Sequence, residues 1–266
     1  MRRLVSQADL VVEVVDARDP LNTLSRRLEG IVGEEGKELV VALNKSDLIP
    51  PRLVDEWISW LASRGYAAVP TSATRRSGIS RLRRKLEELA PRKPFVVAIV
   101  GFPKTGKSSL VNALKGRRSA GTSPIPGSHG YTRRPQLYRV GEDMYLIDTP
   151  GMLPIEGDEL MRVIRGMPPE RLRNPAGVAA KLIGMVLEKV PWAFESAYGV
   201  KSADPYAILE EVARSRGWFY RSTGEPLIEE AARAIIRDFH KGKIPFFYEP
   251  PGEGVGQARD KGQGSG

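Results

Sequence analysis

A chain of 266 residues, 41% of them apolar, is long enough for one ordinary domain and a second, smaller one with its own core. No stretch approaches the roughly 20 uninterrupted apolar residues of a membrane span, and the first residues lack the apolar segment of a secretory signal, so we expect a globular, cytoplasmic protein. The absence of cysteine excludes disulfides and thiolate metal sites.

The net charge of +9 is unevenly distributed. Residues 1–150 hold 25 Lys and Arg against 16 Asp and Glu, whereas residues 151–250 hold 14 of each. The densest run comprises Arg75, Arg76, Arg81, Arg83, Arg84, Lys85, Arg92 and Lys93. Such a field favours RNA or DNA as a partner over a membrane, because no amphipathic anchor accompanies it; a solvated, arginine-rich helix face is the alternative.

Strands and helices are predicted to alternate in the first part of the chain. Residues 10–15 and 39–43 are short, β-branched apolar runs typical of buried parallel strands, and helical material follows each. A helix is then predicted from Pro51 to near Gly65, a strand over 66–69 and an amphipathic helix over 79–89. The alternation predicts an α/β fold with a mostly parallel sheet.

The pattern changes along the second part. A buried strand is predicted over 95–100, a helix over 108–114, and a hairpin over 136–140 and 144–147. Beyond Pro154 helices dominate, with predictions around 158–165, 176–190, 205–216 and 226–241. We therefore predict an α/β domain over 1–154, a small all-helical domain over 155–250 and a disordered, glycine-rich tail over 251–266.

The segment Gly101-Phe-Pro-Lys-Thr-Gly106-Lys107-Ser108 fits the phosphate-loop pattern and lies between a predicted strand and a predicted helix, as its chemistry requires. The glycines let backbone N–H groups turn toward phosphates, and the helix N-terminus adds a favourable dipole. Lys107 is expected to reach the β- and γ-phosphates and Ser108 to bind magnesium. The predicted phosphate-binding residues are Pro103, Lys104, Thr105, Gly106, Lys107, Ser108 and Ser109.

A second motif, Asn44-Lys45-Ser46-Asp47, follows a predicted strand and indicates a guanine-binding loop, which we call the guanine clamp. The Asp47 carboxylate can accept from both N1–H and the exocyclic amine of guanine, whereas adenine offers neither donor. Asn44 would brace the loop, and the Lys45 stem would cover the purine ring. Thr71-Ser72-Ala73, after the third strand, could offer a backbone N–H from Ser72 or Ala73 to the guanine carbonyl.

Asp148-Thr149-Pro150-Gly151 follows the last predicted strand. It suits an Asp148 held near magnesium and a Gly151 whose N–H meets the γ-phosphate. Between the two phosphate motifs, the hydroxyl- and glycine-rich loop 124–134 has the length of a phosphate-sensing segment. Thr132 is the candidate for the hydroxyl that completes magnesium coordination, with Thr122 as the alternative. His129 is either catalytic or a solvated loop histidine.

With these residues in view, the sequence resembles the circularly permuted GTPases of ribosome assembly, the YlqF/YawG (RbgA-like) group. Ordinary GTPases carry the phosphate loop first and the guanine clamp later; here the clamp precedes the phosphate loop, and 148–151 come last. The segments 15–20 (Val-Asp-Ala-Arg-Asp-Pro) and 236–243 also match that group's opening and closing signatures. The resemblance extends over about residues 4–248 and implies a circularly permuted P-loop GTPase domain.

The resemblance implies binding of GTP and GDP with Mg²⁺, hydrolysis of GTP, and a partner in the large ribosomal subunit precursor and its rRNA. We expect the protein to be monomeric when free, although the sequence does not identify its oligomeric state. Because 148–151 lead straight into the helical domain, loss of the γ-phosphate can shift that domain. Catalysis would involve Lys107, Thr132 and Gly151, with magnesium bound by Ser108, Thr132 and Asp148.

Two positions bear on mechanism. Met152 stands where many GTPases keep a water-orienting glutamine, so we expect slow intrinsic turnover that a ribosomal particle raises. Lys104 stands where potassium-activated relatives carry asparagine; its ammonium could replace the monovalent cation, or it is an outward, solvated lysine. Two other functions stay open: a nucleotide-gated RNA-binding scaffold with negligible hydrolysis, and a P-loop ATPase, which Asp47 disfavours.

Overall fold

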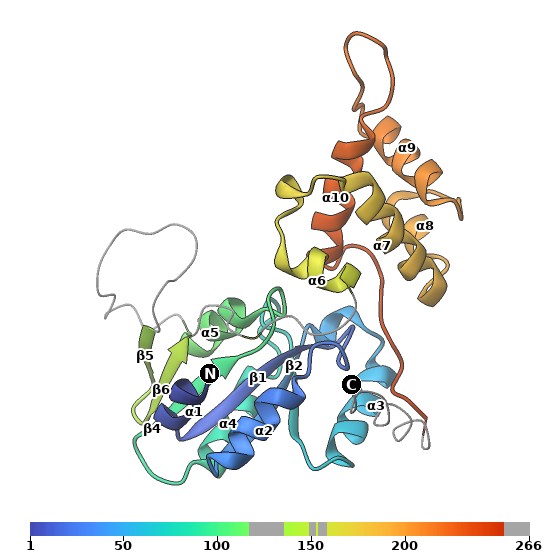
Figure 1. The fold of residues 1–266 in the computed structure, drawn as a ribbon. Helices are drawn as coiled ribbons and strands as arrows, with labels where there is room; N and C mark the ends of the chain where they lie inside the picture. The colour runs from blue at the N-terminus through green and yellow to red at the C-terminus, as the bar shows by residue number, and fades with distance from the viewer. Residues whose placement is uncertain (117–135, 149–152, 154–158, 253–266) are drawn as a thin grey trace, which may run out of the picture.

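The computed structural model of the chain describes residues 1–116, 136–148, 153 and 159–252. Within these residues the chain forms a six-stranded sheet flanked by helices and a separate cluster of helices (Figure 1). The strands are β1 (Leu10–Asp16), β2 (Glu38–Asn44), β3 (Ala67–Thr71), β4 (Phe95–Val100), β5 (Gln136–Val140) and β6 (Met144–Asp148). The predicted strands are thus present, each within two residues of its expected ends.

The sheet has the strand order β3-β2-β1-β4-β6-β5, and all neighbours are parallel except β5 and β6. The chain moves from β1 outward to β3 and then returns to place β4 on the other side of β1. At such a reversal the loops after neighbouring strands diverge and leave a crevice at the carboxyl edge of the sheet. The predicted mostly parallel sheet is confirmed, and the loops that carry the motifs share one edge.

Helices cover both faces of the sheet. They are α1 (Arg2–Gln7), α2 (Arg26–Glu34), α3 (Pro51–Ala62), α4 (Ile79–Leu89) and α5 (Lys107–Lys115). Alternate residues of β1 point to opposite faces. Val12 and Val14 pack with α4 and α5, whereas Val11 packs with α1 and α2, and Val15 with α3. Burial on both faces explains why β1 is apolar along most of its length.

The remaining helices form their own core. They are α6 (Glu159–Gly166), α7 (Pro175–Lys189), α8 (Ala193–Tyr198), α9 (Pro205–Ser215) and α10 (Ile228–His240), with a short 3₁₀ turn at Pro169–Arg171. A second 3₁₀ turn, Ser46–Leu48, follows β2 in the α/β part. Side chains cap the N-termini of two of these helices. Asn174 accepts a hydrogen bond from Gly177 N at the start of α7, and Asp204 accepts one from Ala207 N at the start of α9. The predicted helical C-terminal part is therefore confirmed. The boundary after residue 154 lies outside the described residues and stays a prediction.

The chain beyond α10 runs back to the sheet, passing beside α3 (Figure 1). Ile244 and Phe246 belong to the helical core, whereas Tyr248 reaches the sheet: its N–H donates to Arg18 O (2.9 Å) and its carbonyl accepts from Trp57 Nε1 (3.0 Å). This segment fastens the helical cluster to the side of the sheet that carries α3. None of the described helices is long and apolar enough to cross a membrane.

Candidate functional site

The phosphate loop joins β4 to α5, and its two glycines adopt backbone conformations that other residues rarely take. Gly101 has φ +142°, and a Cβ there would lie 2.6 Å from Val14 O. Gly106 has φ +101°, and a Cβ there would lie 2.3 Å from Asn44 Nδ2. The loop therefore packs against the ends of β1 and β2 at positions where only glycine fits.

The loop ends at the N-terminus of α5, which begins at Lys107. The Lys107 side chain is buried, and its Nζ donates to Phe102 O (2.7 Å), so the ammonium folds back over the loop. Thr105 Oγ1 donates to the same carbonyl (3.0 Å). Ser108 and Ser109 are exposed in the first turn of α5. This arrangement places a cation beside the first turn of a helix, where backbone N–H groups suit a phosphate group.

The guanine clamp contacts the phosphate loop directly. The Asn44 side chain is buried; its Nδ2 donates to Thr105 O (2.8 Å), and its Oδ1 accepts from Ala73 N (3.0 Å). Lys45, with φ +63°, extends its Nζ to Lys104 O (2.7 Å). Asn44 and Lys45 therefore join the loops after β2, β3 and β4, although the clamp and the phosphate loop lie about 60 residues apart in the sequence.

One oxygen of the Asp47 carboxylate accepts a hydrogen bond, and the other accepts none from the described residues. Its Oδ2 accepts from Arg75 Nε (3.0 Å), and the side chain is only 15% exposed. Its Oδ1 is buried, and no hydrogen-bond donor among the described residues reaches it. A buried carboxylate oxygen without a donor is costly, and guanine would supply the missing donor. The structure therefore leaves the expected guanine-reading atom unsatisfied.

The loop after β3 is already engaged. Ser72 N donates to Ser77 O (3.0 Å), and Ala73 N donates to Asn44 Oδ1. Gly78 closes this loop with φ +75°, where a Cβ would lie 2.1 Å from Pro70 O. A guanine carbonyl would have to share the Ala73 N–H with Asn44, so the assignment of Ser72 and Ala73 stays a prediction.

The magnesium end of the site is described in part. In the sheet, Asp148 pairs with Ile99 of β4, so the end of β6 lies next to the strand that leads into the phosphate loop. Thr122, His129, Thr132, Gly151 and Met152 lie outside the described residues, and their predicted roles stay predictions. No group of three or more His, Asp or Glu in the described ranges is arranged to hold a metal. The assignment of Ser108 and Asp148 to Mg²⁺ therefore stays a prediction.

Sequence reasoning missed several charged residues of this edge. Asp16 ends β1 and its Oδ2 accepts from Lys45 Nζ (2.7 Å); Arg18 binds Asp16 through two nitrogens; Arg75 holds Asp47. Segment 15–20 attracted attention only as a family signature. A carboxylate and a guanidinium two residues apart, at the end of a mostly apolar strand, were the available signal, because such charges are seldom buried unless paired.

Ionisation at this edge follows from burial and pairing. Burial opposes the charged form of Asp16, but the charges of Arg18 and Lys45 outweigh it and hold the pKa of Asp16 well below its usual range. Burial lowers the pKa of Lys45 to about 8, although Asp16 acts in the opposite sense. Lys45 is therefore largely protonated at pH 7 and forms a charged pair with Asp16.

The fold and the meeting of these loops define a P-loop nucleotide-binding protein whose motifs follow a permuted order. Residues 2–157 match the family model described as RsgA GTPase, and the chain belongs to that family. The resemblance to the circularly permuted YlqF/YawG group is confirmed by this match and by the solved structures that share the fold.

Curated relatives agree with this family. Nucleolar GTP-binding protein 2 of Neurospora crassa is 33% identical over 267 residues, which cover 96% of this chain and 42% of that protein. An uncharacterised GTP-binding protein of Methanocaldococcus jannaschii is 30% identical over 252 residues, which cover 93% of this chain and 65% of that protein. The chain thus spans only 42% and 65% of the lengths of these two relatives.

Solved structures agree in fold over nearly the whole chain. GNP-bound YlqF from T. maritima aligns with a TM-score of 0.66 at 25% identity and covers 94% of this chain and 96% of that chain. GDP-bound YlqF aligns with a TM-score of 0.69 at 23% identity, with coverage of 94% and 98%. The sheet and the helical cluster therefore recur together in these structures.

Proposed function

We propose that this chain binds GTP and GDP with Mg²⁺ and hydrolyses GTP to GDP and phosphate. The buried, unpartnered Oδ1 of Asp47 carries the proposal, because it stands in a loop hydrogen-bonded to the phosphate loop at Lys104 and Thr105. One nucleotide can then present its base edge to Asp47 and its phosphates to Lys107. Family membership and the printed GTP-binding names of the relatives support the same nucleotide.

The choice of base is tested by exchanging the Asp47 acceptor for a donor. In Asp47→Asn one carboxylate oxygen becomes an NH₂ group, which opposes the guanine amine but complements the 2-carbonyl of xanthine. We expect GTP affinity to fall by about 100-fold or more and xanthosine triphosphate to become the better ligand. Equilibrium competition among GTP, ATP and xanthosine triphosphate measures this. Equal binding of ATP and GTP by the wild-type chain would contradict a guanine site.

Hydrolysis is proposed from the phosphate side of the site. Lys107 and the first turn of α5 are arranged for a phosphate, and Ser108 is accessible to a metal ion. We propose that the intrinsic rate is slow and that large ribosomal subunits raise it. Single-turnover phosphate release, with and without subunits, separates this function from a nucleotide-gated scaffold. Release that stays at the uncatalysed rate under both conditions would leave the scaffold as the function.

The Lys104 side chain is exposed, and its backbone carbonyl is held by Lys45. The positive charge of Lys104 contributes to the lowered pKa of His240 in α10, after burial of that side chain. We propose that the Lys104 ammonium takes the place of a monovalent cation and makes hydrolysis indifferent to potassium. The rate should agree within about twofold in potassium and in sodium. A steep rise in turnover with potassium would overturn the substitution.

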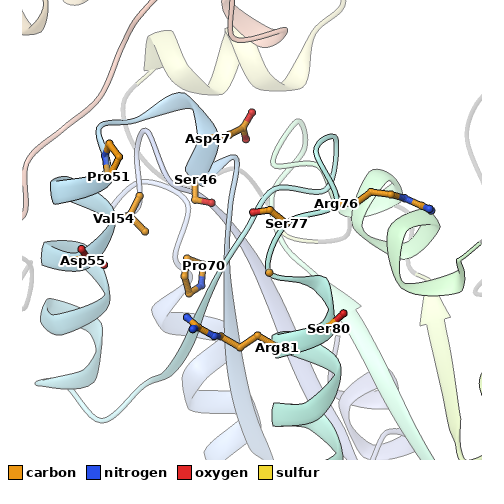
Figure 2. A pocket seen from close by; sticks show the side chains of 11 residues that line it. Ser46, Asp47, Pro51, Val54, Asp55, Pro70, Arg76, Ser77, Ser80 and Arg81 are labelled. Carbon is orange, nitrogen blue, oxygen red and sulfur yellow. The ribbon is translucent and has the colours of Figure 1, made fainter.

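We also propose that the chain acts on the large ribosomal subunit precursor through its rRNA. The exposed arginines around the N-terminus of α4 support an RNA partner. Two adjoining hollows of about 520 and 370 Å³ lie here and share Arg76 and Ser80. Figure 2 shows the larger one, with Arg81 extending from α4 toward Pro70. The smaller one is lined by Arg83 and Arg84 among others.

The arginines of α4 differ in how they are occupied. Arg83 Nη2 donates to Leu114 O (2.6 Å) and is therefore part of the packing between α4 and α5. Arg76, Arg81 and Arg84 are exposed, and no carboxylate among the described residues pairs with them. By contrast, Arg92 and Lys93 pair with Asp9 and Asp143, respectively. The unpaired arginines are the ones available to phosphate groups.

This difference supplies a matched test. The double change Arg81→Gln/Arg84→Gln should weaken co-sedimentation with large ribosomal subunits and reduce the slope of log affinity against log salt by about 1 to 2. The control Arg92→Gln/Lys93→Gln removes the same charge from paired positions and should leave the slope nearly unchanged. Equal effects of the two double changes would assign RNA affinity to net charge instead of to α4.

A further inference from the structure

Five charged side chains are buried where the helical cluster meets the carboxyl ends of β1 and β2. We call Asp16, Arg18, Asp19, Lys45 and Arg165 the buried charge cluster. The exposed fraction is 15% for the Lys45 side chain and 4% or less for the other four. Charged side chains that are buried to this extent are stable only when they are paired with opposite charges. Each member of the cluster therefore depends on its neighbours for a charged partner.

Arg18 connects β1 to the helical cluster. Its Nε and Nη2 bind the two carboxylate oxygens of Asp16 (3.0 and 2.9 Å), and its Nη1 donates to Phe239 O in the last turn of α10 (2.7 Å). The guanidinium carbon also lies 4.9 Å from the centre of the Phe239 ring. One planar group therefore holds a carboxylate on one side and a helix C-terminus on the other.

Arg165 makes the same connection from α6. Its Nη2 lies 3.2 Å from Asp19 Oδ2, and its Nη1 lies 3.9 Å from Asp16 Oδ2. Burial raises the pKa of Asp19 although Arg165 opposes this, which shows how strongly this carboxylate is desolvated. Two helices of the cluster thus converge on this group of charges, because α6 contacts the two aspartates and α10 contacts Arg18.

Lys45 connects the same aspartate to the nucleotide loops. Its Nζ lies 2.7 Å from Asp16 Oδ2 and 2.7 Å from Lys104 O. Asp16 Oδ2 is thus within 4 Å of a nitrogen of Lys45, Arg18 and Arg165. A continuous path of charged contacts runs from the phosphate loop through the guanine clamp to α6 and α10.

We infer that Asp16 is a positioning residue for the guanine clamp and that the buried charge cluster couples nucleotide binding to the docking of the helical cluster. This inference rests on the proposed guanine nucleotide site. A bound purine orders Lys45, which is the partner of Asp16, and so fixes the position of the Asp16 carboxylate. Arg18 and Arg165 then keep their buried contacts with Asp16 best when the helical cluster stays docked on the sheet. Because coupling free energies are reciprocal, docking of α10 must also strengthen nucleotide binding.

This route differs from the direct connection through 148–151. The route through the buried charge cluster responds to the base, which GTP and GDP share, so it distinguishes the occupied site from the empty one. The γ-phosphate, by contrast, distinguishes GTP from GDP. A ribosomal surface that displaces the helical cluster would therefore weaken binding of either nucleotide.

Two variants of the full chain separate positioning from docking. Asp16→Asn removes the partner of Lys45 and should raise the Kd of GDP about 10-fold. Arg18→Met cuts the link to Phe239 O but keeps Lys45–Asp16 and Arg165–Asp19, so the remaining cluster is electrically balanced and should fold. Because the coupling is reciprocal, this variant should raise the Kd of GDP by about fivefold, the same factor by which GDP slows exchange of α10 in the wild-type chain. Titration with a fluorescent GDP analogue measures both constants.

Hydrogen exchange of peptides covering 228–243 supplies the second readout. In the wild-type chain, GDP with Mg²⁺ should slow exchange near the end of α10 by about fivefold or more. In Arg18→Met this GDP-dependent difference should disappear. The control is Arg52→Ala, which breaks the exposed Arg52–Glu249 pair (3.8 Å) near the returning segment and should change neither readout.

The outcomes separate the two proposals. A wild-type chain that does not bind GDP overturns the nucleotide site and this inference with it. Binding without a change of exchange in α10 overturns the coupling alone, as does a GDP-dependent difference that persists in Arg18→Met. An unchanged GDP affinity in folded Asp16→Asn, verified by circular dichroism, overturns the positioning role of Asp16.

Discussion

The chain carries two dense groups of charged side chains in opposite environments. The buried charge cluster lies between the sheet and the helical cluster, and every member has a charged partner. The arginines at the N-terminus of α4 face solvent and line two open hollows. The arginines of α4 form one run in the sequence, whereas the members of the buried charge cluster come from segments far apart in it. Burial and pairing decide which group holds the protein together and which is available to a partner.

The largest effect is expected from breaking the buried group. Asp16→Ala leaves Arg18, Lys45 and Arg165 with one carboxylate among them, and an uncompensated buried charge is severely destabilising. We expect the free energy of unfolding to fall by about 3–5 kcal/mol, measured by denaturant unfolding. A loss below about 1 kcal/mol would show that water reaches these charges in solution.

A smaller effect is expected from acid, through His240 at the edge of the buried group. Burial lowers the pKa of His240 to about 3, with the charges of Lys104 and Lys45 acting in the same direction, and its Nε2 lies 2.9 Å from Ile164 O. The unfolded chain binds a proton near pH 6.5, whereas the folded chain does not until about pH 3. Stability therefore falls as the pH drops below 6.5, by about 2 kcal/mol at pH 5.

Unfolding at pH 7 and pH 5 measures this dependence. His240→Gln keeps an amide for the Ile164 carbonyl but cannot take up the proton, so it should lose most of the difference between the two pH values. A variant that is as sensitive to acid as the wild-type chain would assign the dependence to other groups.

The smallest effect on stability is expected at α4. Arg81→Gln/Arg84→Gln removes exposed charges without a carboxylate partner in the described part of the chain, so the free energy of unfolding should change by no more than about 0.5 kcal/mol. The RNA affinity should nevertheless fall. A large loss of stability would mean that these arginines belong to the packing, as Arg83 does through Leu114 O.

Much of the fold was predictable because its signals are local. The apolar runs of β1, β2 and β4 lie buried on both faces of the sheet, and α4 repeats its buried Ile79, Leu82 and Leu86 at helical spacing. Two helices, α1 and α8, were not predicted, since each has only six residues and offers no periodicity. The bounds of α2 were missed because Gly30 and Gly33 weaken its helical pattern.

The site was predictable for a different reason, and only in part. The motifs at 44–47 and 101–108 carry their chemistry in a few adjacent residues, and the structure brings them into contact at Asn44 and Thr105. The pairing of Asp19 with Arg165 spans 146 positions and has no local signature. The same holds for Arg18 and the carbonyl of Phe239, which lie 221 positions apart.

A crystal structure of the chain with GDP and Mg²⁺ is the most direct test of a single nucleotide site shared by both loops. We expect Asp47 Oδ1 to accept from N1–H of the base and Lys107 Nζ to leave Phe102 O for the β-phosphate. A bound nucleotide whose base lies away from Asp47, or whose phosphates lie away from Lys107, would contradict it.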